Sequence, residues 1–177
     1  MDAEREGQQA IERHPDAGFT LVEAVIAVGM LATLAAGMAQ VFWFSARAIH
    51  VARVRTFAAV LAGEKMEQLR SLTWAHLPGG ALSSDTTTNL AADPPSSGGP
   101  GLAAAPAGSL DVNTPFYVDY ASAAGARVGG LGAAAYIRRW SVTPLPADPE
   151  NELMLQVRVL TVGGGDWRLA SIKVRRP

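Results

Sequence analysis

The chain contains no cysteine among its 177 residues, which excludes disulfide bonds, thiol nucleophiles, cysteine zinc sites and a lipoprotein anchor. Charge is also sparse, because only 18% of the residues are Asp, Glu, Lys or Arg and the formal net charge is −1. Without an overall basic field, no nucleic-acid partner is expected. The three histidines, His14, His50 and His76, share no metal-ligand spacing, so we expect neither a metal site nor another cofactor.

Signals for catalysis are missing as well. No arrangement of serine, histidine and acid stands out, and the glycine-rich tract between residues 78 and 115 is not followed by the lysine–serine or lysine–threonine pair of a phosphate-binding loop. An acidic stretch, 148–152, offers oxygen ligands for calcium, but a solvated turn is the expected reading. We therefore expect no enzyme activity and no catalytic residue.

The longest uncharged run of the chain follows a charged N-terminal segment. Residues 1–18 are polar, with five acids and two arginines, whereas the 23 residues from Ala24 to Ala46 carry no charge. A helix of about 20 apolar residues spans a bilayer, and Trp43 lies where an interfacial aromatic belt would form. The pattern predicts a transmembrane helix over 19–46, in which Glu23 is the single charge.

A helical period continues over residues 47–77, so one helix is predicted from about residue 20 to residue 76. Its apolar stripe is Val51, Val54, Ala58, Leu61, Ala62, Met66, Leu69 and Leu72. The other faces carry charges that we expect to be solvated: Arg53, Arg55, Glu64, Lys65, Glu67 and Arg70. This amphipathic segment needs an apolar surface to cover.

The C-terminal part supplies that surface. Residues 78–115 are rich in glycine and proline and predict a long loop with weak order. Over 116–177 the period changes to two, which predicts about four consecutive strands in an antiparallel meander, with a turn at 163–166. The predicted class is therefore α+β, with a long N-terminal helix packed on a small antiparallel sheet. The basic strand residues Arg138, Arg139, Lys173, Arg175 and Arg176 are expected to be solvated rather than to form a patch.

The junction between the first two segments reads Asp-Ala-Gly-Phe-Thr-Leu-Val-Glu over residues 16–23. It resembles the prepilin signature of type IV pilins and type II secretion pseudopilins, the class III prepilins. The resemblance implies that a prepilin peptidase cleaves after Gly18 and methylates the new N-terminal residue, Phe19. It also implies that Glu23, the fifth mature residue, takes part in subunit assembly.

The position of Glu23 within an apolar helix has a physical explanation in this family. A carboxylate in an apolar helix is costly, although the first turns of a helix favour an anion. Cleavage after Gly18 makes the Phe19 amine a cation, and methylation keeps its charge. The pair can close within one chain or, in the family's picture, between Glu23 and the Phe19 amine of a neighbouring subunit.

Two further segments, 64–72 and 138–144, resemble minor pilins of the PilV-like pilus-modification type. The sequence departs from the family in its net acidic leader, since leaders are usually basic near the cut. It also lacks the cysteines with which major pilins often close a C-terminal loop, which argues against a major pilin.

The resemblance also implies a cellular setting. The chain is expected to be a single-pass protein of the bacterial inner membrane, with its C-terminal domain in the periplasm before it enters a pilus or pseudopilus. Its expected partners are the prepilin peptidase, other pilins or pseudopilins through the N-terminal helix, the inner-membrane assembly platform and membrane lipid. A type II secretion pseudopilin and a membrane-anchored binding module that never polymerises are the alternatives to a minor pilin.

Overall fold

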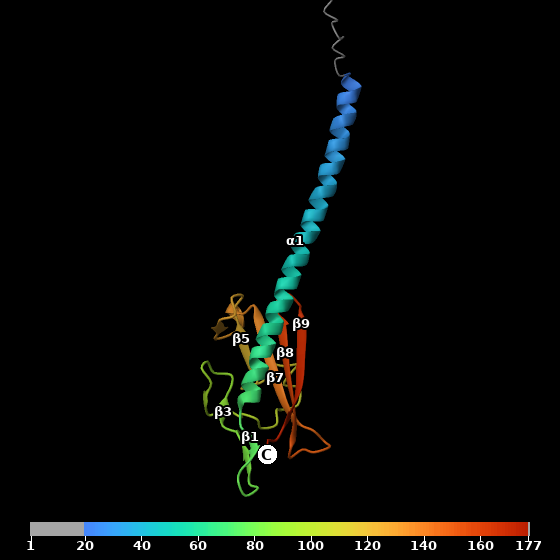
Figure 1. Ribbon diagram of the computed structural model, residues 1–177. Helices are drawn as coiled ribbons and strands as arrows, with labels where there is room; N and C mark the ends of the chain where they lie inside the picture. The colour runs from blue at the N-terminus through green and yellow to red at the C-terminus, as the bar shows by residue number, and fades with distance from the viewer. Residues whose placement is uncertain (1–19, 177) are drawn as a thin grey trace, which may run out of the picture. The chain divides into compact units, whose positions relative to one another are not determined.

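The computed structural model describes residues 20–176, which form two compact units with a boundary between Ala48 and Ile49. The first unit is helical throughout its described part, from Leu21 onward. The second unit is α+β. The helix α1 (Leu21–Ser71) contributes residues to both units. In Figure 1 its colour runs from blue to green along the chain.

The helix α1 ends at Ser71 rather than near residue 76. The hydroxyl of Ser71 donates to the Gln68 carbonyl over 2.8 Å, and the Lys173 ammonium donates to the Arg70 carbonyl, so two carbonyls of the last turn are satisfied. The following residues form β1 (Trp74–His76), which pairs with β2 (Leu82–Ser84). The sequence signal for this hairpin is Gly79-Gly80, whose φ angles of 96° and 84° suit glycine.

The main sheet is antiparallel, with the strand order β6-β5-β7-β8-β9. The four strands that the sequence predicts are all present, and the short β6 adds a fifth at one edge. The strands are β5 (Val118–Ala121), β6 (Arg127–Val128), β7 (Tyr136–Pro144), β8 (Glu152–Thr161) and β9 (Asp166–Val174). A 3-10 turn, η1 (Leu131–Ala133), precedes β7.

The core of the second unit lies between α1 and one face of this sheet (Figure 1). The helix contributes a buried stripe, which confirms the predicted amphipathic face from residue 58 onward. The sheet contributes Trp140 and Val142 from β7 and the alternating apolar residues of β8. The buried apolar residues of the helix and of these two strands are Ala58, Leu61, Ala62, Met66, Leu69, Tyr136, Trp140, Val142, Leu153, Leu155, Val157 and Val159.

The apolar residues of the edge strand β9 face outward, whereas their alternating pattern suggests that they face the core. Its apolar residues Ile172 and Val174 are 59% and 57% exposed, whereas Lys173 between them is half-buried. The register explains this orientation, because Lys173 pairs with Leu153, whose side chain lies in the core. Directly opposed residues of two strands lie on the same face of a sheet, so Lys173 faces α1.

Segment 78–115 is more ordered than its composition indicates. It contains β2 and a second hairpin, β3 (Thr88–Asn89) with β4 (Ser96–Ser97). Asp85 organises the approach to this hairpin, since its carboxylate accepts bonds of 3.0 Å from the amides of Thr87 and Thr88 and of 2.7 Å from the Thr88 hydroxyl. Composition identifies glycine and proline but neither the strand pairing nor the bonds of Asp85, so the sequence predicted only a loop here.

Candidate membrane and assembly segment

The first turn of α1 is capped by a residue that the sequence analysis did not single out. The Thr20 hydroxyl accepts a bond of 3.3 Å from the Glu23 amide, and the Thr20 carbonyl accepts one of 3.1 Å from the Ala24 amide. Thr20 is therefore the N-cap of the helix. The spacing Thr-x-x-Glu of residues 20–23 is the pattern of a capping box, and this signal was available in the sequence.

Glu23 consequently lies in the first turn of α1, and its side chain is exposed. The positive end of the helix dipole favours a carboxylate at this place. Gly18 and Phe19, the predicted cleavage and methylation residues, lie outside the described residues. The structure therefore places one of the three predicted site residues, at the position where a charge costs least.

The residues after Glu23 present apolar side chains on every side of the helix. The large apolar residues from Leu21 to Phe44 are more than half exposed. Leu31, for example, is 68% exposed and Leu34 is 64% exposed. The most apolar window of α1 has a mean hydropathy of 2.0 and is not buried within the molecule. The Thr33 hydroxyl is satisfied by the Met30 carbonyl at 2.8 Å, as a polar group in lipid requires. By length and composition α1 can cross a membrane.

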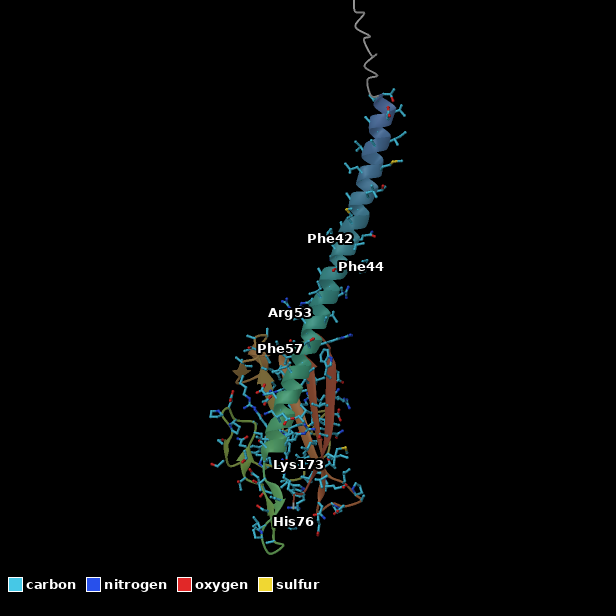
Figure 2. The ribbon with its side chains drawn as sticks, in the orientation of Figure 1. Phe42, Phe44, Arg53, Phe57, His76 and Lys173 are labelled. Carbon is cyan, nitrogen blue, oxygen red and sulfur yellow. The ribbon has the colours of Figure 1, made fainter. Side chains whose placement is uncertain are left out.

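Aromatic residues mark the end of this run. The rings of Trp43 and Phe44 meet edge-on with centroids 5.5 Å apart, and the Arg47 guanidinium lies 5.6 Å from the centre of the Trp43 ring. Figure 2 shows Phe42 and Phe44 at this part of the helix. Aromatic rings beside a basic residue are typical of the layer between hydrocarbon and water.

The second unit contains a buried charge cluster, which we define as Lys65, Asp119, Arg127 and Arg138. Lys65 is fully buried, and Asp119 and Arg138 are 5% and 2% exposed. Asp119 accepts bonds from Arg138 Nε at 2.7 Å and from Arg127, and Lys65 Nζ lies 2.9 Å from its Oδ2. The expectation that Lys65 and Arg138 are solvated was wrong, because one inward-facing carboxylate on β5 draws both cations into the core.

The remaining donors of the cluster are also satisfied. Lys65 donates to the Leu90 carbonyl at 2.8 Å and lies 4.4 Å from the centre of the Trp140 ring. Arg127 donates to the carbonyls of Leu90 and Ala92, so the cluster joins α1 and the sheet to the segment before β4. Buried charges persist only with such partners.

The cluster perturbs its own ionisation. Burial lowers the pKa of Lys65 to about 8, although the Asp119 carboxylate acts in the opposite direction. Burial alone would raise the pKa of Asp119, but the hydrogen bonds from Arg138 and the charge of Lys65 outweigh it and hold that pKa below its ordinary value. Such shifts also occur at catalytic sites, but here every group is bonded inside the core.

The expectation that the five basic strand residues are solvated was wrong for Arg175 as well as for Arg138, because both are buried. Arg139 lies on the face away from Arg138 and donates to the Asn113 side chain at 2.9 Å. Arg175 is 7% exposed, stacks 3.6 Å above the Trp74 ring and donates to the carbonyls of Ala75 and Ser83. Among the five, Arg176 is the one that is exposed, while Arg139 and Lys173 are half-buried.

The acidic stretch 148–152 forms a local turn. Both carboxylate oxygens of Asp148 accept from the side-chain amide of Asn151, at 3.0 and 3.1 Å. Within residues 20–176, no group of three or more histidines and acids is arranged to hold a metal ion.

Comparison with protein families matches the N-terminal part of the chain. The family model of the prokaryotic N-terminal methylation motif matches residues 13–39, which include the predicted cleavage junction and the first turns of α1. No curated protein and no solved structure matches the chain.

This match and the apolar first half of α1 support the class of type IV pilins and pseudopilins. The α+β architecture, with a long N-terminal helix packed on an antiparallel sheet, is consistent with the pilin fold. The motif indicates a structural, pilin-like protein rather than an enzyme, and it implies processing by a prepilin peptidase and anchoring in a membrane.

Proposed function

We propose that the chain is a minor pilin, a structural subunit that takes part in the assembly or initiation of a type IV pilus. The observation that carries the proposal is the methylation motif over residues 13–39, which runs into the first half of α1, where the large apolar side chains from Leu21 to Phe44 are more than half exposed. Within the class, the resemblance of segments 64–72 and 138–144 to pilus-modification subunits supports a minor pilin over a secretion pseudopilin.

In this proposal the peptidase cleaves after Gly18 and methylates the Phe19 amine. Glycine suits the cleavage position because it presents no side chain to the peptidase. The chain is held in the inner membrane with its second unit in the periplasm, and it then passes through the assembly platform into a fibre of pilins.

Glu23 has the assembly role. The Glu23 amide donates to the Thr20 hydroxyl at 3.3 Å, so Glu23 belongs to the capped first turn of α1, four residues after Phe19. An unpaired acid at the centre of a membrane helix costs about 2.5–3.5 kcal/mol. Pairing with the Phe19 amine of the adjacent subunit neutralises both charges and sets the axial register of the fibre.

Processing is tested first. The protein recovered from membranes of a host with an active prepilin peptidase is compared with its Gly18→Ala variant by intact mass and N-terminal sequence. We expect a chain that starts at N-methylated Phe19, and we expect this species to be lost in the variant. A wild-type chain that retains residues 1–18 would overturn the assignment and leave a membrane-anchored module.

Deletion of the gene then distinguishes a subunit of a type IV pilus from a subunit of a secretion pseudopilus. Loss of surface pili with normal protein secretion supports the minor pilin, whereas loss of secretion with normal pili assigns the chain to a pseudopilus. Glu23→Gln, which keeps the shape and removes the charge, should be inserted and cleaved normally but excluded from the fibre, while Glu23→Asp should retain part of its incorporation.

A further inference from the structure

The second unit has a hollow at the end of its sheet where the turn between β8 and β9 lies. Its volume is about 510 Å³. One side is formed by the α1 residues His50, Val51 and Arg55, and the other by the turn, with Val162 and Trp167. None of the residues that line it is acidic.

The turn beside this hollow is held by specific hydrogen bonds and close packing. The Thr161 amide donates to the Gly165 carbonyl at 2.9 Å, and the Thr161 hydroxyl accepts from the Gly165 amide at 2.7 Å. A Cβ atom at Gly165 would lie 2.0 Å from the Trp167 ring, so glycine is required for the indole to pack on the turn. Val162 is bonded through its amide to the Ala135 carbonyl, yet its side chain is 66% exposed.

Chain length places one side of the hollow near the bilayer. His50 follows Ala46, the last residue of the uncharged run, by four residues. Even a fully extended chain advances at most about 3.6 Å per residue, so His50 lies within about 14 Å of the end of that run. The bound itself follows from covalent geometry alone, and nearness to the bilayer requires in addition that the run is anchored in a membrane.

The chemistry of the hollow fits the surface of that membrane. Val51 and Val162 present apolar surface, and tryptophan is preferred where hydrocarbon meets headgroups. Arg55 is exposed, and within residues 20–176 neither it nor His50 forms an ion pair with a carboxylate. A guanidinium free of carboxylates beside apolar surface matches the phosphate of an anionic phospholipid.

We propose that this hollow is a docking surface for an anionic phospholipid of the membrane that holds the helix, with the Val162 side chain in the interfacial layer and Arg55 on the lipid phosphate. The inference rests on membrane anchoring and not on the choice between pilus and pseudopilus. Entry of the subunit into a fibre then requires release of this lipid contact.

The cysteine-free chain allows a direct test, since each introduced cysteine is the only one to be labelled. The full-length protein carrying Val162→Cys is labelled with a nitroxide and placed, one chain per disc, in nanodiscs of phosphatidylcholine with or without phosphatidylglycerol. The readout is the collision rate of the nitroxide with apolar oxygen and with a water-soluble nickel chelate. Val174→Cys is the matched control, because Val174 is similarly exposed, at 57%, and lies at the opposite end of β9.

We expect the label at 162 to gain oxygen collisions and lose nickel collisions when phosphatidylglycerol is present, while the label at 174 stays aqueous. Arg55→Glu should abolish this change. Arg53→Glu alters charge equally two residues away on the same helix (Figure 2) but does not line the hollow, so it should leave the change intact.

Three results would overturn the proposal: equal aqueous exposure at 162 and 174 in both lipids, equal loss in both arginine variants, or protection that needs two chains per disc. The second would mean nonspecific charge attraction, and the third would mean that a second copy occupies the hollow. A label at Leu34→Cys reports anchoring separately, because loss of its oxygen exposure would contradict the membrane assignment itself.

Discussion

The two units of the chain differ in which side chains they bury and which they expose. In the first unit, every described side chain is exposed, and those from Ala24 to Ala46 are uncharged. In the second unit, Lys65, Asp119 and Arg138 are buried, while Ile172 and Val174 on the edge strand face outward. Polarity alone would assign the opposite burial to several of these residues.

The difference shows that burial follows the available partners rather than hydropathy. The carboxylate of Asp119 and carbonyls such as that of Leu90 satisfy the buried cations within one folded unit. Within residues 20–176 no side chains cover the apolar helix of the first unit, so lipid or neighbouring helices must supply that cover. One unit is therefore complete as a fold, and the other is complete only in an assembly or a membrane.

The largest expected effect comes from removal of the anion that holds the buried charge cluster. Asp119→Ala leaves the cations unpaired in the core, and we expect the free energy of unfolding to fall by about 3–5 kcal/mol. Denaturant unfolding of the full chain in mild detergent, followed by near-ultraviolet circular dichroism, measures it. The matched control is Asp166→Ala, because Asp166 is 40% exposed and pairs with Arg158. That change should cost at most about 1 kcal/mol, and equal losses would contradict a special role for burial.

A charge placed in the first unit should affect insertion and not folding. Leu34→Asp puts an acid in the middle of the uncharged run, and we expect the free energy of membrane insertion to become less favourable by about 2.5–3.5 kcal/mol. A glycosylation or protease-protection assay of insertion measures this change, with Leu34→Ala as the control. The denaturant midpoint of the second unit should not move, and a parallel loss of its stability would show that the two units are not independent.

The buried lysine gives the second unit a pH dependence. In the folded chain Lys65 loses its proton near pH 8, whereas a lysine in the unfolded chain keeps it to about pH 10.5. Between these values the unfolded state binds more protons, so the free energy of unfolding should rise with pH, by on the order of 3 kcal/mol in total.

The Lys65→Met variant isolates this effect from the titration of other groups. Burial also lowers the pKa of Lys173, which adds to the rise, and burial raises the pKa of Tyr117, which opposes it at the upper end. The difference between wild type and Lys65→Met should therefore carry the rise due to Lys65. A difference that is flat from neutral pH upward would show that Lys65 is not desolvated.

The smallest expected effect is at the surface of the same helix. Arg70 and Glu67 form an ion pair of 2.7 Å, but their side chains are 48% and 68% exposed. Glu67→Gln should change the free energy of unfolding by less than about 0.5 kcal/mol, and added salt should erase the difference. The same detergent unfolding assay measures it, and a loss that approaches that of Asp119→Ala would break the contrast between exposed and buried pairs.

Much of the fold could be predicted from the sequence because it depends on local periodicity. The uncharged run, the stripe from Ala58 to Leu69 and the alternation of β8 each follow from side-chain spacing, and the structure confirms them. Among the site residues, Glu23 could be located from the motif and from its isolation in an apolar helix.

The rest depends on contacts between distant residues. That Lys65 is buried follows from Asp119 and Leu90, and Arg138 lies inward because Asp119 is on the neighbouring strand. No spacing within either segment contains this information. The outward face of β9 likewise follows from its register with β8, and the early end of α1 from the hairpin that begins at Trp74.

Arg175 has a consequence for how the end of the chain is secured. Its guanidinium lies on the Trp74 ring and donates to carbonyls of the β1–β2 hairpin, while its Nε donates to the Glu150 carbonyl at 2.9 Å. This clasp fastens the last strand by folding alone. A chain closed in this way needs no oxidase for this closure, and reductants leave the closure intact, so its lifetime depends on unfolding and not on redox conditions.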